Sequence, residues 1–370
     1  MALLDGARPR VRKTEKGKAG MRNLLRRVLV MREAGVLAAL ILIMLFFGLF
    51  TTTFFTATNL TNVLRQSAVL GIMTMAVTFL IISGEFDLSI GSTFALSAVM
   101  ATVMMEHGIP MILAFLLALV LAAVVGFLNG VIVTKLRIPS FIATLGTMMI
   151  IRSAVLMASE RRPRVLGDRG LVACIFGGGE LFGAIPVPII WLLVVVAISW
   201  VVLAKTPFGY KVYATGGNIQ AAKLSGISTD RVKITNFMLT SFAAGLAGLI
   251  SLCFLRMVAP VQGEGYELEA IAATVIGGTA LGGGVGSIFG AFIGSFMLAI
   301  IKNGLVLMGT NPYLQDGVLG LVILVAVVVN LRLAAARSGV RPMALVRRLV
   351  GIRSPSGSDQ QPPHAQGGSP

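Results

Sequence analysis

Hydrophobic residues along this chain gather in long runs, separated by short polar or glycine-rich breaks. A helix that crosses the hydrocarbon core of a bilayer needs roughly 20 mainly apolar residues. By that rule the runs predict membrane-spanning helices near residues 34–55, 60–83, 92–107, 110–133, 140–158, 186–204, 234–256, 268–284, 287–307 and 312–331. The third and eighth are short or interrupted by glycine, so they are candidates for half-helices or re-entrant segments. The pattern predicts an all-α polytopic membrane protein with about ten transmembrane helices.

The composition supports the same fold class. Of the 370 residues, 56% are hydrophobic and 12% are charged, and the mean hydropathy is +0.90. Soluble domains carry about 25% charged residues. The net charge of +16 lies mostly at the two ends, with ten Lys/Arg in residues 1–33 and six in residues 331–370. Because basic segments are retained on the cytoplasmic side, we expect both termini there.

Charge and composition divide the chain into three parts. We expect residues 1–33 to be a basic cytoplasmic extension, residues 34–331 the transmembrane domain, and residues 332–370 a basic tail that ends in a disordered Pro/Gly/Ser-rich segment. The alternation of spans places residues 205–233 inside, and SERRPR (159–164) outside, where its arginines fit the charge rule poorly. Nucleic acid is not an expected partner, because no basic face interleaved with aromatic residues accompanies the charge.

Residues 205–233, which we call the polar segment, are more than a turn between two spans would need. Asn218 can cap a short helix over residues 219–225 by accepting a hydrogen bond from a backbone N–H group. Gly226 follows at the position where a left-handed residue commonly ends a helix. We therefore expect the polar segment to present a helix to another molecule.

The flanks of this short helix carry their own signals. Gly216 and Gly217 allow a turn before it. Ser228 or Thr229 can cap the helix that follows, and Asp230 is favourably placed against the positive N-terminal end of that helix.

Two carboxylates, Glu85 and Asp87, lie between apolar runs in the stretch SGEFDLSIGS. Ionisable groups at membrane depth are costly, which favours a functional role such as lining a substrate path. Flanking Gly84 and Gly91 suggest a broken helix. The alternative is an acidic turn at the membrane surface, or a cap for the helix from Ser92, and the sequence leaves both open.

Four other polar residues lie within or beside apolar runs. Arg152 and Lys302 could extend their charged ends to the membrane surface, and Asn236 and Asn303 could hydrogen-bond between helices. Each could instead line a polar path.

Glycines recur every four residues near the eighth and ninth spans. The triplet 282–284 is expected to interrupt a helix, which leaves Gly286, Gly290 and Gly294 as a ridge on one helical face. Small residues at this spacing allow close helix packing.

Groups for catalysis or metal binding are sparse. The two cysteines, Cys174 and Cys253, are far apart in sequence, and the two histidines are His107 and His364, so no metal-ligand spacing exists. The phosphate-binding pattern G-x-x-x-x-G-K-[ST] is absent. We therefore expect no enzyme activity, no metal and no cofactor in this chain.

Several long motifs together resemble the membrane-spanning permease subunit of bacterial ribose-type sugar ABC transporters, within the branched-chain amino acid and monosaccharide permease superfamily. They cover most of residues 60–330 in the family's order, and are GEFDLSIGS (84–92), IPSFIATLGTM (138–148), TPFGYKVYATGGNIQAAKLSGI (206–227), GYELEAIAATVIGGTALGGGVGSIFGAFIGS (265–295) and NPYLQDGVLGLVILVAV (311–327).

The resemblance implies a permease of the bacterial inner membrane, embedded in lipid and paired with a second copy of itself. It also implies a cytoplasmic ATPase of the double-cassette sugar type, which binds the ATP and Mg, and a periplasmic or lipid-anchored sugar-binding protein. The substrate would be a ribose-like monosaccharide or polyol. Glu85 and Phe86 stand where the commoner form of the family that this chain resembles has Gly and Ile, a departure that leaves open a substrate other than ribose.

Residue by residue, the resemblance makes the short helix of the polar segment the ATPase-coupling element. Its candidate coupling residues are Gly216, Gly217, Asn218, Ala221, Ala222, Ser225 and Gly226, and the small side chains among them would fit a groove on the ATPase. The candidate substrate path comprises Glu85, Asp87, Ser89, Thr144, Asn236 and Asn303. The alternative function is a secondary, ion-coupled transporter of a small polar solute, which would need Glu85 or Asp87 as its coupling residue.

Overall fold

The computed structural model describes residues 34–338, apart from positions 168, 169, 182 and 184. The expectations for the N-terminal extension (1–33) and for most of the C-terminal tail (332–370) lie outside these residues. By compactness the chain divides after Val327, and the description below concerns the unit that precedes this point.

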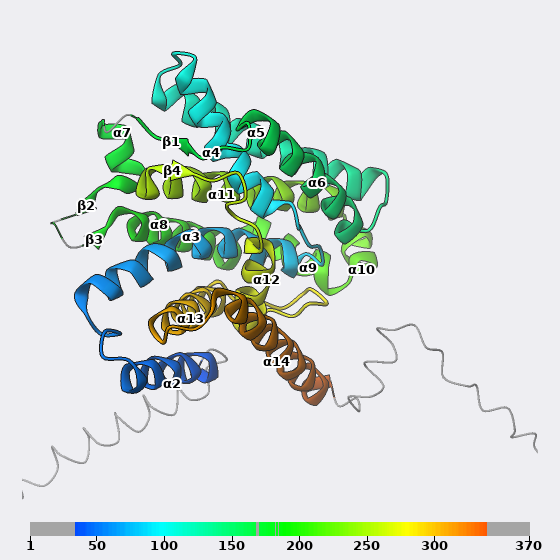
Figure 1. Cartoon of the computed structure of the whole chain (residues 1–370). Coiled ribbons are helices and arrows are strands. Elements are labelled where there is room, and N and C mark those ends of the chain that lie inside the picture. Colours follow the sequence, from blue (N-terminus) through cyan, green and yellow to red (C-terminus); the bar gives the residue numbers. More distant parts are fainter. Residues whose placement is uncertain (1–33, 168–169, 182, 184, 339–370) are drawn as a thin grey trace, which may run out of the picture. The chain divides into compact units, whose positions relative to one another are not determined.

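The described elements are almost entirely helical, which confirms the all-α class (Figure 1). The apolar helices are α2 (Ala34–Phe50), α3 (Ala57–Ile82), α4 (Ile90–Glu106), α5 (Met111–Lys135), α6 (Ser140–Ala158), α8 (Val187–Lys205), α11 (Thr229–Leu255), α12 (Tyr266–Ile276), α13 (Ile288–Leu307) and α14 (Pro312–Ser338). Shorter elements are α7 (Leu171–Ala173), the π-helical turn η1 (Cys174–Gly178), α9 (Pro207–Gly217) and α10 (Ile219–Leu224).

Among the described residues, four two-residue strands lie in the connections between helices and form two short antiparallel pairs. β1 (Arg164–Val165) pairs antiparallel with β4 (Met257–Val258), and β2 (Glu180–Leu181) pairs with β3 (Ile185–Pro186). Arg164, the last residue of SERRPR, also forms an ion pair with Glu106 at the end of α4.

Each predicted apolar run contains a helix, but the runs differ in length. Six helices (α3, α5, α6, α8, α11 and α13) are long and apolar enough to cross a membrane. α4 is a shorter apolar helix of 17 residues, and α12 has only 11, so the third and eighth runs form short helices, as expected of runs that are short or interrupted by glycine. A total of ten spans stays a prediction, as does the cytoplasmic position of both termini.

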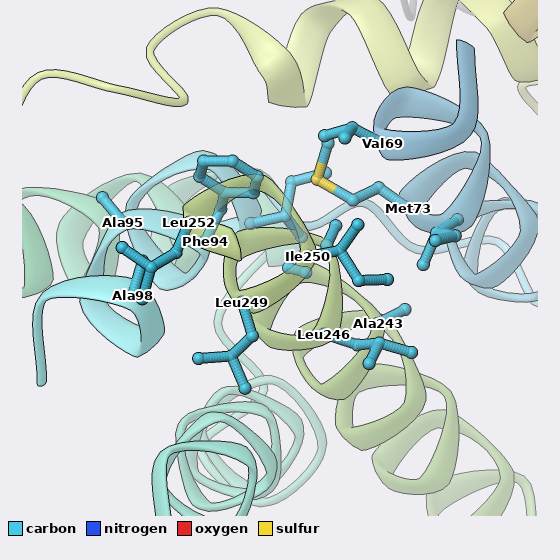
Figure 2. Packing of buried hydrophobic residues seen from close by; sticks show 14 of the residues in the cluster. Val69, Met73, Phe94, Ala95, Ala98, Ala243, Leu246, Leu249, Ile250 and Leu252 are labelled. Carbon is cyan, nitrogen blue, oxygen red and sulfur yellow. The ribbon is translucent and has the colours of Figure 1, made fainter. Parts of the chain in front are cut away.

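α3 and α11 form the centre of the helical unit. α11 packs against α3 on one side and against α4 and α5 on another, whereas α8 and α13 cover other parts of α3 (Figure 1). Figure 2 shows Met73 of α3, Phe94 of α4 and Ile250 of α11 among the buried side chains that join these helices. Small residues let the backbones approach closely. A Cβ atom on Gly248 of α11 would overlap the carbonyl oxygen of Phe94.

The outer helices have a different surface. Large apolar side chains of α5 and α6 are exposed, including Phe127, Phe141 and Ile150. Exposed apolar rows on long apolar helices suit contact with lipid chains rather than water.

The starts of the two short helices lie side by side. Gly91 in the first turn of α4 touches Gly263, and a Cβ atom on Gly91 would overlap the Gly263 carbonyl oxygen. The rings of Phe94 and Tyr266 stack edge to face, with 5.3 Å between their centroids. Residues 259–265 therefore run from β4 to the beginning of α4, where α12 starts.

Candidate functional site

The polar segment contains the predicted capped helix. The side chain of Asn218 accepts hydrogen bonds from the backbone N–H groups of Gln220 and Ala221, at 3.1 and 3.0 Å. Gly226 adopts the left-handed conformation with φ +79°, and its N–H donates to the Lys223 carbonyl oxygen at 3.0 Å. α10 ends at Leu224, one residue before the predicted end. Both caps were predictable because they depend on residues close in sequence.

The predicted turn at Gly216 and Gly217 is wrong. These glycines are the last two residues of α9, a helix that Thr206 caps by accepting a hydrogen bond from the Gly209 N–H group at 3.4 Å. Gly216 lies against the end of α3, where a side chain would overlap the carbonyl oxygen of Ile82. Space, rather than turn formation, accounts for a glycine there.

The orientation of α10 also corrects one expected partner contact. Ala222 is only 4% exposed and packs inside the chain, so it cannot enter a groove on another protein. Ala221, Ser225 and Gly226 are exposed. The most exposed apolar side chain of α10 is Leu224, at 91%, and no sequence motif had singled it out.

The turn between α3 and α4 buries the carboxylate of Asp87, which is 1% exposed. Its Oδ1 atom accepts hydrogen bonds from the backbone N–H and the hydroxyl of Ser89, at 2.8 and 2.6 Å. Asn129 Nδ2 of α5 donates to the same hydroxyl oxygen at 2.8 Å. The other carboxylate oxygen, Oδ2, has no hydrogen-bond partner among the described residues. Asp87 thus stabilises the start of α4 through Ser89. The sequence had left open this local role and a role in the substrate path.

α6 holds the same turn from another side. Thr144 Oγ1 accepts a hydrogen bond from the Leu88 N–H at 3.0 Å and donates to the Ser140 carbonyl oxygen at 2.8 Å. The Ser140 hydroxyl oxygen accepts from the Phe86 N–H at 3.3 Å. Backbone groups that the broken helix leaves free are therefore satisfied by side chains of a neighbouring helix, as burial in a membrane requires.

Glu85 and Asn236 connect this turn to α11. Glu85 Oε1 lies 2.5 Å from Lys233 Nζ, and both side chains are largely buried. Asn236 Nδ2 donates to the Phe79 carbonyl oxygen at 3.2 Å and to Ser83 Oγ at 3.0 Å.

Asn303 lies apart from the other candidates for the substrate path. It exchanges side-chain hydrogen bonds of 2.9 and 2.8 Å with Asn59 at the start of α3. Phe79, the Asn236 partner, is 20 residues further along that helix, which corresponds to about 30 Å. The structure therefore brings together Glu85, Asp87, Ser89, Thr144 and Asn236, but not Asn303.

Two of the three predicted packing glycines lie on a helical face. Cβ atoms on Gly290 and Gly294 of α13 would overlap the carbonyl oxygens of Gly277 and Ala273 at the end of α12. Gly286 was expected on the same helix, but Ser287 caps α13 and Gly286 precedes it.

The two basic residues predicted within or beside apolar runs, Lys302 and Arg152, also have partners in the structure. Lys302 Nζ of α13 lies 2.7 Å from Glu269 Oε1 of α12, and Arg152 Nη1 donates to the Pro260 carbonyl oxygen at 2.8 Å. Sequence reasoning missed these partners because nothing local marks them. Among the described residues, no group of three or more His, Cys, Asp or Glu side chains could hold a metal ion.

Residues 59–327 match the family model described as branched-chain amino acid transport system / permease component. The chain belongs to this family, and is therefore a multi-pass transport protein of the bacterial inner membrane rather than an enzyme.

Individual relatives are similar over nearly their whole length. The ribose import permease protein RbsC of Bacillus subtilis (strain 168) is 39% identical over 306 residues, which cover 83% of this chain and 95% of the relative. RbsC of Escherichia coli (strain K12) is 38% identical, with 81% and 94% covered. The autoinducer 2 import system permease protein LsrC of Salmonella typhi is 35% identical, with 82% and 87% covered. No solved structure matches the chain significantly.

Proposed function

We propose that the chain is the membrane-spanning subunit of an ABC importer that carries a ribose-like monosaccharide or polyol into the cell. The similar permeases import ribose or autoinducer 2 by name. A pathway for a neutral sugar needs few uncompensated charges, and the charges of Glu85, Lys233, Glu269 and Lys302 are paired within the chain.

The observation that carries the proposal is α10. It is a capped helix between two spans, and its Leu224 side chain is almost fully exposed. This side chain adds no stability to the chain by itself, because it is not buried. A short helix that presents an apolar side chain can bind in a groove on another protein. The partner is a cytoplasmic ATPase of the double-cassette type, which holds the ATP and Mg.

Contacts at the two ends of α4 support an orientation in the membrane. The turn before α4 contacts the polar segment through the ion pair of Glu85 and Lys233. The last residue of α4, Glu106, pairs with Arg164. A helix of 17 residues separates these points by about 25 Å. The polar segment carries five Lys/Arg against one Asp, which supports a cytoplasmic position for it. The arginines of 159–164 would then lie on the outer side.

Two further partners complete the importer. A second copy of the chain would form the other wall of the pathway, and a periplasmic or lipid-anchored sugar-binding protein would deliver the substrate to the outer face. The exposed side chains of Arg161 and Arg162 provide positive charge there for an acidic docking surface.

The test is ATP hydrolysis in proteoliposomes that contain this chain and a double-cassette sugar-type ATPase from the same organism. Binding proteins loaded with ribose, other monosaccharides or polyols are added one at a time. We expect one loaded binding protein to stimulate hydrolysis, which would also name the substrate. If the chain formed no complex with any ATPase, the ion-coupled alternative would replace this proposal, with Asp87 as the first residue to mutate because Glu85 is already paired.

A further inference from the structure

Three segments that are far apart in sequence meet backbone to backbone at the end of α9, within the polar segment. They are the end of α3 at Ile82, the end of α9 at Gly216, and the loop between α12 and α13 at Gly283 and Gly284. The Gly284 N–H donates to the Ile82 carbonyl oxygen at 2.8 Å. We call this contact the glycine junction.

The glycine junction has no room for side chains. A Cβ atom on Gly216 would overlap the Ile82 carbonyl oxygen and lie 2.8 Å from the Gly284 nitrogen. One on Gly284 would lie 2.7 Å from the Gly217 Cα atom, and one on Gly283 would lie 3.0 Å from the Gly216 carbonyl oxygen. Gly283 and Gly284 also have φ values of +80° and +74°, which other residues rarely adopt.

Side chains strengthen the same contact. Tyr213 Oη of α9 donates to the Gly286 carbonyl oxygen at 2.8 Å, so α9 holds the loop between α12 and α13 at two points. The rings of Phe208 and Phe79 stack, with 6.5 Å between their centroids, and join α9 to α3.

The far end of the polar segment holds the end of α3 as well. Lys233 pairs with Glu85, and Asn236 donates to Ser83 and to the Phe79 carbonyl oxygen. Both helices that flank α10 therefore contact the turn between α3 and α4.

α12 lies between the glycine junction and the start of α4. Its C-terminal end leads into the glycine junction, and its start lies beside Gly91 and Phe94 of α4. A displacement of the junction along α12 would therefore reach the place where the two short helices begin.

We propose that Gly216, Gly283 and Gly284 are positioning residues that make the polar segment, the end of α3 and the end of α12 move as one body. Direct backbone contacts contain no side-chain rotamers that could absorb a displacement. Motion of α10 therefore passes to the turn between α3 and α4, where most of the candidate substrate-path residues lie. The inference rests on the proposed function, because the displacement would come from the ATPase bound at α10.

Adjacent glycines provide a matched test. Gly216→Ala places its methyl group on the Ile82 carbonyl oxygen, whereas in Gly217→Ala the nearest atom is the Gly284 Cα at 4.0 Å. Amide hydrogen exchange of the purified chain tests the junction without the ATPase. We expect Gly216→Ala to speed exchange in both residues 82–88 and residues 277–286, and Gly217→Ala to leave both unchanged.

Coupling is measured in the assembled complex. In complexes adjusted to equal amounts of bound ATPase, we expect Gly216→Ala to lower stimulation by the loaded binding protein roughly tenfold relative to basal hydrolysis, within the usual range of coupling free energies. Wild-type exchange or wild-type stimulation in Gly216→Ala would overturn the proposal. A wild-type complex that fails to form would instead count against the proposed function, and the exchange experiment would still decide the junction.

If Gly216→Ala fails to fold, Tyr213→Phe takes its place. This variant removes the hydroxyl that binds Gly286 and retains the ring. Faster exchange in residues 277–286 with weaker stimulation would support the junction, and unchanged values of both would overturn it.

Discussion

The carboxylate of Glu85 and the ammonium group of Lys233 lie 2.5 Å apart, although 148 residues separate them in the chain. The pair joins the turn between α3 and α4 to the first turns of α11, and both side chains are largely buried. A charge at membrane depth without a partner is costly. The pair therefore explains how Glu85 is tolerated between two apolar runs, and it links the candidate substrate path to the polar segment.

Breaking this pair should destabilise the chain. Glu85→Gln leaves Lys233 as a largely buried charge without its partner, and Lys233→Met does the same to Glu85. Each single change should cost about 3 kcal/mol, as for other buried pairs that lose one member. Thermal unfolding in detergent measures the effect. The double variant should cost less than the sum of the two, because it removes both charges. Additive losses would show that the pair is not coupled.

Asp87 should stabilise the start of α4 through its acceptor atoms. Asp87→Ala leaves the N–H and the hydroxyl of Ser89 without an acceptor, which should cost about 2–3 kcal/mol. Asp87→Asn retains one oxygen that can accept these bonds and should cost less. Thermal unfolding and transport of the two variants make the comparison. Equal stability of Asp87→Ala and wild type would remove the anchoring role.

Two neighbouring alanines of α10 should respond in opposite ways. Ala222→Arg forces a charged side chain into the contact of α10 with α9 and α11, so we expect low yield and a lower unfolding temperature. Ala221 is exposed, so Ala221→Arg should fold normally and weaken ATPase binding. Size-exclusion chromatography followed by co-purification with the ATPase separates the two outcomes. A well-folded Ala222→Arg variant would contradict the inward orientation.

Leu224 should be the apolar anchor for the ATPase. Leu224→Asp should weaken association by about 2 kcal/mol or more, the range of interface hot spots, without lowering the stability of the chain. Leu136 is also exposed, at 66%, and lies at the end of α5 outside the polar segment. Leu136→Asp therefore serves as the control and should bind normally. Equal loss of binding in both variants would argue against a specific contact at Leu224.

Gly290 should be needed for the packing of α13 on α12. Even Gly290→Ala places a methyl group on the Gly277 carbonyl oxygen, so it should lower thermal stability, and Gly290→Leu should lower it further. Gly317 has open space around its Cα, and Gly317→Ala is the matched control. If Gly290→Leu changed oligomer size while the monomer kept its stability, the contact would instead belong to an interface between copies.

Local patterns in the sequence were sufficient for much of the fold. Apolar runs located the helices, because each must satisfy its own backbone hydrogen bonds and present apolar side chains to lipid or to other helices. Asn218 and Gly226 marked both ends of α10, since a cap depends on groups within three or four residues. The two short runs predicted α4 and α12, because each contains fewer residues than the roughly 20 that a full-length span needs.

Only the tertiary structure decided which residues face one another. It paired Glu85 with Lys233, turned Ala222 inward and Leu224 outward, placed Asn303 at the other end of α3 from Asn236, and showed that Gly216 fits against Ile82 instead of forming a turn. Each of these facts is a contact between segments far apart in the chain. Sequence periodicity records which side of a helix is apolar, but when almost every side is apolar it cannot record which neighbour that side meets.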